Sequence, residues 1–175
     1  MKTKMPLLKA QKIADWLETV LSPGCDRVCT AGSVRRRKPT VGDIEIVCVP
    51  KVQPDLFGEP AGIELDAVLD TLQERGDLLR IKGGDKYRQY EMPEYGCILD
   101  LFLTTREQLG VQLLIGTGGA DFSHQFVTRQ NTWITLSTGA VVHGLLPDDL
   151  RVKDGRIWRG DEALPTPEEA DAFRL

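Results

Sequence analysis

Residues 32–45 read GSVRRRKPTVGDIE, and this stretch decides the fold that we expect for the chain. A glycine–serine turn, Gly32-Ser33, leads into three arginines and a lysine, and two acids, Asp43 and Glu45, follow with one residue between them. Alternate side chains of a strand point to the same face of a sheet. We therefore expect both acids to project together from one strand while the neighbouring isoleucines face the core.

The same stretch supplies groups that bind a metal ion and a phosphate. Carboxylate oxygens are the ligands that Mg²⁺ prefers, and such an ion neutralises the charge of a triphosphate. The backbone N–H groups of a tight Gly-Ser turn can receive phosphate oxygens. Asp43 and Glu45 beside Gly32-Ser33 therefore predict a nucleotidyl-transfer site.

A third carboxylate lies further along the chain. Residues 97–103, CILDLFL, form an apolar run with Asp100 in its middle. A charge in such a strand is costly unless it is paired or bound to a metal. The alternative is an edge strand with an outward acid. Because the run follows the strand with the paired acids and lies among other strand-like segments, we interpret Asp100 as the third metal ligand.

In their order along the chain, these motifs resemble the family X DNA polymerases, the polymerase beta-like group of the nucleotidyltransferases. The resemblance spans about residue 10 to the end. It rests on Gly32-Ser33-x-Arg35-Arg36, Gly42-Asp43-x-Glu45, Ile81-Lys82-Gly83 followed by Lys86, the strand around Asp100, Thr117-Gly118, and residues 152–158. It implies an α+β fold, with a nucleotidyltransferase palm (a mixed β-sheet with packed helices) at 1–104 and a small thumb subdomain at 105–175. A palm with a thumb alone resembles the small viral and phage-like members.

The resemblance implies a repair-type DNA polymerase that fills short gaps. It would transfer dNMP from a dNTP to a primer 3′-hydroxyl and release pyrophosphate, acting on a primer–template or gapped DNA. Asp43 and Glu45 would hold two Mg²⁺ ions, for which Mn²⁺ would substitute. Asp100 would hold only the ion at the primer hydroxyl, and it is the implied proton acceptor.

Other positions take roles from the same resemblance. Ser33 and Arg36 match contacts to the β- and γ-phosphates, and Gly42 matches a backbone donor to them. The implied nucleotide-binding set is Gly32, Ser33, Arg36, Gly42, Thr117 and Gly118. The implied contacts to DNA phosphates are Lys82, Lys86 and Arg88.

The sequence departs from the family pattern at four places. Glu45 stands where Asp is usual, which is expected to change the metal preference. No arginine flanks Asp100 on its own strand, so a familiar partner of this acid is missing. Ile115-Gly116 replaces an aromatic pair before the Thr-Gly turn, and Ser123 replaces an asparagine that contacts the base. The first two departures concern rate, and the last two concern nucleotide choice.

Two other functions remain open. A template-independent nucleotidyltransferase acting on RNA, protein or a small acceptor would use the same three acids. The match of residues 105–175 to a thumb favours the polymerase. A degenerate module that only binds nucleic acid ranks last, because all three carboxylates and the phosphate turn are present.

Composition gives further expectations. The 175 residues are 41% hydrophobic, enough for two small lobes, but a net charge of −4 is unusual for a DNA-binding protein. Basic residues cluster at 35–38, 80–88 and 151–159, which predicts a basic cleft with an acidic back. No run approaches the roughly 18 apolar residues of a membrane span, and no signal peptide is evident. We expect a cytoplasmic monomer, or a viral or phage protein acting in the host cytoplasm, without membrane contact.

Periodicity and turn residues predict the remaining elements. Helices are expected at 6–21, 63–72, 105–115 and 120–129. A last helix is expected to begin at the capping box of Thr166 and to run to the end of the chain. Strands are expected at 26–30, 44–49, 78–82, 86–92 and 97–103. Residues 51–60 are expected to form a loop, 130–149 a loop or irregular hairpin, and 153–156 a tight hairpin turn. The four cysteines are expected to be buried thiols, with a Cys25–Cys29 or Cys29–Cys97 bond as the alternative.

Overall fold

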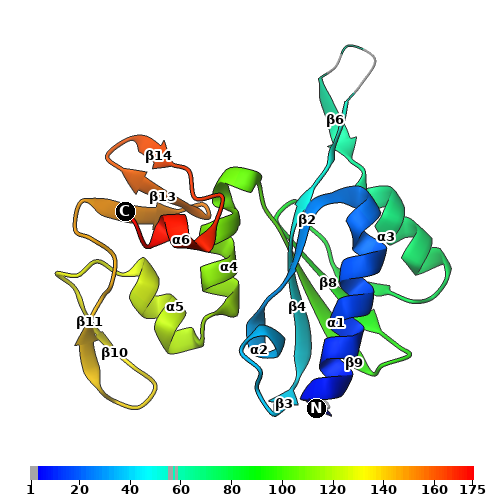
Figure 1. The fold of residues 1–175 in the computed structure, drawn as a ribbon, viewed down its shortest axis with the longest axis horizontal. Coiled ribbons are helices and arrows are strands. Elements are labelled where there is room, and N and C mark those ends of the chain that lie inside the picture. The colour runs from blue at the N-terminus through cyan, green and yellow to red at the C-terminus, as the bar shows by residue number, and fades with distance from the viewer. Residues whose placement is uncertain (1–3, 55–56, 58) are drawn as a thin grey trace. The chain divides into compact units, whose positions relative to one another are not determined.

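The computed structural model describes residues 4–54, 57 and 59–175. The chain divides into two compact units, Met1–Thr105 and Arg106–Leu175. Each combines helices and strands, so the α+β class is confirmed (Figure 1). The described part of the chain holds no helix that is both long and apolar enough to cross a membrane. All four cysteines are free, and all but Cys29 are buried.

A five-stranded sheet forms the centre of the first unit. Its order is β2 (Cys25–Thr30), β4 (Asp43–Pro50), β9 (Cys97–Leu103), β8 (Tyr87–Met92) and β7 (Leu79–Lys82). Strands β4 and β9 are parallel, and the other neighbours are antiparallel, so the predicted mixed sheet is confirmed. Strand β9 lies between two others. The alternative that Asp100 belongs to an edge strand is therefore wrong.

Helices α1 (Leu7–Leu21) and α3 (Leu65–Glu74) pack on one face of this sheet (Figure 1). Both are amphipathic, and their buried stripes contact the alternate residues of β4 and β9, including Ile44 and Ile46. Burial of this apolar surface is the main favourable term in the folding of the unit. Because side chains alternate along a strand, Asp43 and Glu45 project from the opposite face.

Shorter elements complete the first unit. The turn η1 (Ser22–Gly24) ends α1, helix α2 (Gly32–Arg35) follows β2, and β1 (Met5–Pro6) pairs with β3 (Thr40–Val41). Strands β5 (Val52–Pro54) and β6 (Pro60–Ile63) form a hairpin that projects from the sheet (Figure 1). The predicted loop at 51–60 is therefore wrong at Val52–Pro54 and at Pro60, while residues 55–56 and 58 lie outside the described residues.

The second unit contains η2 (Arg106–Gln108), α4 (Leu109–Thr117), α5 (Ala120–Val127) and α6 (Glu169–Ala172). Its strands form a hairpin of β10 (Trp133–Thr135) with β11 (Val141–His143), and a sheet of β12 (Leu150–Lys153), β13 (Arg156–Arg159) and β14 (Glu162–Leu164). Side chains of α4, α5 and β13, including Val111, Phe126 and Ile157, share its core.

Two predictions about this unit are wrong. Helix α4 continues through Gly116 and Thr117, which were expected to break it. The last helix is capped by Glu168 and Asp171 and not by the predicted Thr166, which is buried. The backbone of Thr166 is engaged in other hydrogen bonds: its N–H donates to the Glu107 carbonyl at 2.7 Å, and its carbonyl accepts from Gly110 N–H at 2.7 Å.

Candidate nucleotide and metal site

The three predicted acids are neighbours on the face of the sheet opposite α1 and α3. The parallel pairing places Glu45 directly beside Asp100, and Asp43 lies two residues before Glu45 on the same face. Neighbouring strands are about 4.8 Å apart. All three side chains are half-buried. The register therefore gathers residues that are more than fifty positions apart in the sequence into one acidic group.

The Gly32-Ser33 turn lies against Glu45. Ala31 N–H donates to the Glu45 carbonyl at 2.8 Å, which holds the start of α2 beside β4. Ser33 N–H donates to Glu45 Oε2 at 3.3 Å. Gly32 has φ +58°, and a Cβ at this position would lie 1.4 Å from Glu45 Oε2. The Glu45 carboxylate thus occupies the hollow over the turn, and only glycine leaves room for it.

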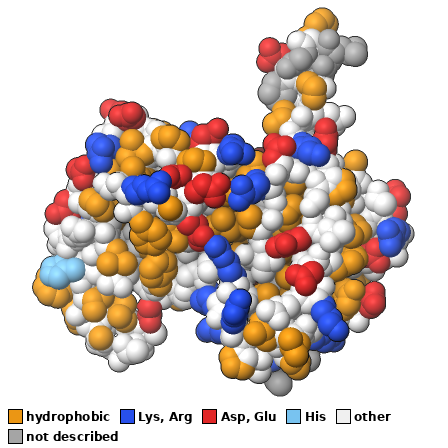
Figure 2. Space-filling model, viewed as in Figure 1, with side chains coloured by type: hydrophobic (Ala, Val, Ile, Leu, Met, Phe, Trp, Pro, Cys, Tyr) orange, Lys and Arg blue, Asp and Glu red, His pale blue; other side chains and the backbone are white. Residues whose placement is uncertain are grey.

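The turn also holds an unsatisfied polar group. Ser33 Oγ is buried and has no hydrogen-bond partner among the residues that the structure describes. Buried hydroxyls are usually hydrogen-bonded, so this atom suits a ligand oxygen. Gly42 lies in open space, since a Cβ built on it would meet no atom within 4 Å. Exposed Arg36 caps α2, and Lys and Arg side chains gather over this helix (Figure 2).

The three neighbouring carboxylates, Asp43, Glu45 and Asp100, repel one another. Burial, and then the charges of Asp43 and Asp100, raise the pKa of Glu45 above its ordinary value. The hydrogen bond from Ser33 N–H and the charge of Arg36 oppose this shift of the Glu45 pKa. A bound cation would relieve the repulsion between the carboxylates.

Asp100 has two partners that sequence reasoning missed. Tyr87 Oη donates to Asp100 Oδ1 at 2.6 Å, and Gln89 Nε2 donates to the same oxygen at 2.7 Å. Both come from β8, the strand on the side of Asp100 away from Glu45. Asp100 is therefore held by donors from a neighbouring strand and not by a side chain of its own strand, β9. The alternation in β8 could have suggested that these two residues share a face, but not which strand lies beside them.

The donor set of the group fits a hard divalent ion by its chemistry, because it consists of carboxylate oxygens and lies beside an unpaired hydroxyl. The oxygens themselves do not converge: within residues 4–54, 57 and 59–175, no three Asp, Glu, His or Cys side chains are arranged to hold a metal ion. Glu45 is turned onto Ser33 N–H, and Asp100 Oδ1 faces β8.

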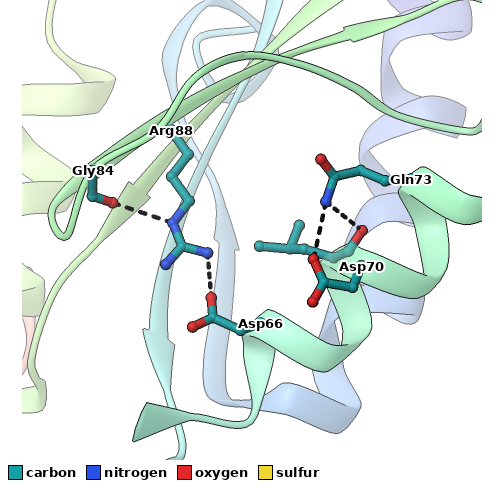
Figure 3. Close-up of polar contacts among 6 residues, drawn as sticks. Asp66, Asp70, Gln73, Gly84 and Arg88 are labelled. Atoms are coloured by element: carbon teal, nitrogen blue, oxygen red, sulfur yellow. Dashed lines mark hydrogen bonds and ion pairs between the residues drawn. The ribbon is translucent and has the colours of Figure 1, made fainter.

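Of the predicted DNA contacts, Lys82 and Lys86 are exposed. Arg88 lies on the other face of the sheet, with its side chain only 13% exposed. It forms an ion pair with Asp66 of α3, and its Nε donates to the Gly84 carbonyl at 3.2 Å (Figure 3). These contacts border a polar cavity of about 270 Å³ between α3 and β8. We therefore assign Arg88 to the fold and not to a DNA surface.

The remaining predicted nucleotide contacts, Thr117 and Gly118, lie at the end of α4 in the second unit. Gly118 N–H donates to the Leu114 carbonyl at 2.8 Å, and a Cβ on Gly118 would lie 2.5 Å from the Phe122 ring. Glycine is thus required here by the close approach of α5. Ser123 Oγ donates to the Ile115 carbonyl at 2.9 Å, so this hydroxyl joins α5 to α4.

No family model matches the chain, and no curated protein matches it.

Proposed function

We propose that the protein is a small two-metal nucleotidyltransferase that extends a DNA primer along a template, as short-gap repair polymerases do. The observation that carries the proposal is the group of acids on the face of the sheet opposite α1 and α3, where parallel pairing sets Glu45 beside Asp100 and the Gly32-Ser33 turn adjoins both Glu45 and its strand. Acidic oxygens next to groups that can bind phosphate are the parts that this reaction needs.

Each group would have one role. Asp43 and Glu45 would hold two Mg²⁺ ions, with Asp100 as a further ligand of one of them. Bound Mg²⁺ would neutralise triphosphate charge and polarise the reacting oxygens. Ser33 would receive phosphate oxygens through its N–H and its unpaired Oγ. Arg36 would bind the same phosphates through its planar guanidinium, which suits two-point contact. Asp100 would accept the proton of the primer hydroxyl.

The second unit supports the proposal through its sequence. Its Thr117-Gly118 turn and 152–158 segment resemble those of a family X thumb, whereas enzymes with small acceptors usually have an unrelated helical lobe. In this scheme the first unit is the palm and the second is the thumb. Lys82 and Lys86, both exposed, would contact DNA phosphates without reading sequence.

Primer extension tests the proposal. A labelled primer is offered on templated, gapped and single-stranded DNA with each dNTP and NTP, with Mg²⁺ or Mn²⁺. We expect templated addition of dNMP by the unmodified protein, and none by Asp43→Ala. Glu91→Ala is the matched control and should remain active, because it removes an exposed acid of β8 on the face of the sheet that carries Asp43, Glu45 and Asp100. Addition to single-stranded DNA would instead favour a template-independent nucleotidyltransferase, and no addition would refute the proposal.

A further inference from the structure

We infer that Tyr87 and Gln89 are positioning residues for Asp100, and that they leave a single carboxylate oxygen, Oδ2, to face a metal ion. This inference rests on the proposed function, because it takes Asp100 as a ligand. The hydrogen bonds described for Asp100 both end on Oδ1, at 2.6 Å from Tyr87 Oη and 2.7 Å from Gln89 Nε2.

The register of the sheet puts these donors where they act. Asp100 is paired with Glu45 on one side and with Gln89 on the other, so the three side chains form one row across β4, β9 and β8. Paired residues of neighbouring strands have Cβ atoms about 4.5–5.5 Å apart. At this distance, Gln89 can reach the nearer oxygen of Asp100 but not the Glu45 carboxylate on the far side of Asp100.

The tyrosine is held by its own neighbours. Tyr87 is paired with Phe102 of β9, and the two ring centroids are 5.2 Å apart with a tilt of 40°. The packed rings limit rotation of Tyr87, so its hydroxyl is presented to Asp100 before any ligand binds. Asp100 has only apolar residues, Ile98 and Phe102, as same-face neighbours on β9. Its orientation therefore depends on the donors from β8.

Two donors on one oxygen have a definite chemical consequence. A carboxylate offers two oxygens with about four lone pairs, and Oδ1 already accepts two hydrogen bonds. Rotation of the carboxylate about its last torsion would break both bonds. The free oxygen is thus fixed on the side of the row that faces Glu45. Partners of this kind orient metal ligands, and their loss typically lowers metal affinity or activity by roughly ten- to a hundredfold.

The test uses Tyr87→Phe, Gln89→Met and the double variant, with Tyr90→Phe as the matched control. Tyr90 lies on the same strand but on the helix-covered face, so its hydroxyl is remote from Asp100. Mn²⁺ binding is measured by electron paramagnetic resonance without DNA or nucleotide, and kcat and KM for dNTP are measured in primer extension. Thermal melting of each variant checks that it is folded.

We expect each single variant to bind Mn²⁺ more weakly, and the double variant to lose roughly ten- to a hundredfold in Mn²⁺ affinity and kcat, with little change in KM for dNTP. Gln89→Glu, which places a negative charge in contact with Oδ1, should be more harmful than Gln89→Met.

Several outcomes separate the inference from the proposed function. Wild-type Mn²⁺ affinity and kcat in a folded double variant would overturn the inference and leave the polymerase proposal intact. Equal losses in Tyr90→Phe would overturn it too, because the effect would then be one of general stability. If the unmodified protein extends no primer while Tyr87→Phe still weakens Mn²⁺ binding, the positioning role stands and the proposed reaction falls.

Discussion

The contact between Glu45 and the Gly32-Ser33 turn leads to a prediction about nucleotide binding. In the structure, the Glu45 carboxylate takes the hollow and the N–H group of Ser33 that the proposed reaction assigns to a phosphate. Carboxylate and phosphate would compete for this donor. Glu45→Asp shortens the side chain by one methylene, about 1.5 Å, so the acid can no longer reach Ser33 N–H.

The expected size of the effect follows from the hydrogen bond. A hydrogen bond to a charged group contributes about 1.5–3 kcal/mol to stability. The distance of 3.3 Å is beyond the usual range for N–H···O bonds, which points to the lower end. Since about 1.4 kcal/mol corresponds to a tenfold change in affinity, Glu45→Asp should bind dNTP without metal up to about tenfold more tightly.

Titration calorimetry with dGTP in a chelating buffer measures this affinity, and Glu45→Gln is the matched control. Glutamine keeps the length of the side chain and can still accept from Ser33 N–H, but it carries no charge. Tighter binding by Glu45→Gln with no change in Glu45→Asp would refute the reasoning, because charge and not competition for the donor would then control binding. In primer extension, Glu45→Asp should also shift the Mn²⁺/Mg²⁺ rate ratio toward Mg²⁺.

Other expectations concern stability and DNA. At neutral pH, Glu45→Gln should melt at a higher temperature than the unmodified protein. The pKa of Glu45 is raised in the folded state, so the ionised carboxylate opposes folding. The difference in melting temperature should vanish as the pH falls through that pKa to below the ordinary value of 4.5. Asp100→Ala should abolish primer extension in a variant that thermal melting shows to be folded, and residual extension would remove Asp100 from the ligand set. Arg88→Met should lower the melting temperature by at least about 2 °C, because it removes both the ion pair with Asp66 and the hydrogen bond to the Gly84 carbonyl, while the affinity for DNA stays unchanged. Lys82→Ala should reduce the slope of log affinity against log salt by about one unit, whereas Lys12→Ala, which removes an exposed lysine of α1, should not alter it.

Local patterns in the sequence were sufficient for most elements of the first unit. The spacing of apolar residues located α1 and α3, because a helix repeats every 3.6 residues, and alternation placed Asp43 and Glu45 on one face. Segments without a clear period were predicted less well. Thr166 carries a good capping signal, yet contacts with Glu107 and Gly110 engage its backbone, and the helix begins later.

The sequence by itself identified Asp43, Glu45 and Asp100 as site candidates, because each is an acid within an apolar strand. Tertiary structure alone decided that Glu45 pairs with Asp100, that Tyr87 and Gln89 donate to the far side of this acid, and that Arg88 serves the fold. The physical reason is strand order and register. A strand shows which of its side chains share a face, but its neighbours are chosen by the packing of the whole sheet against its helices, which no local stretch of residues encodes.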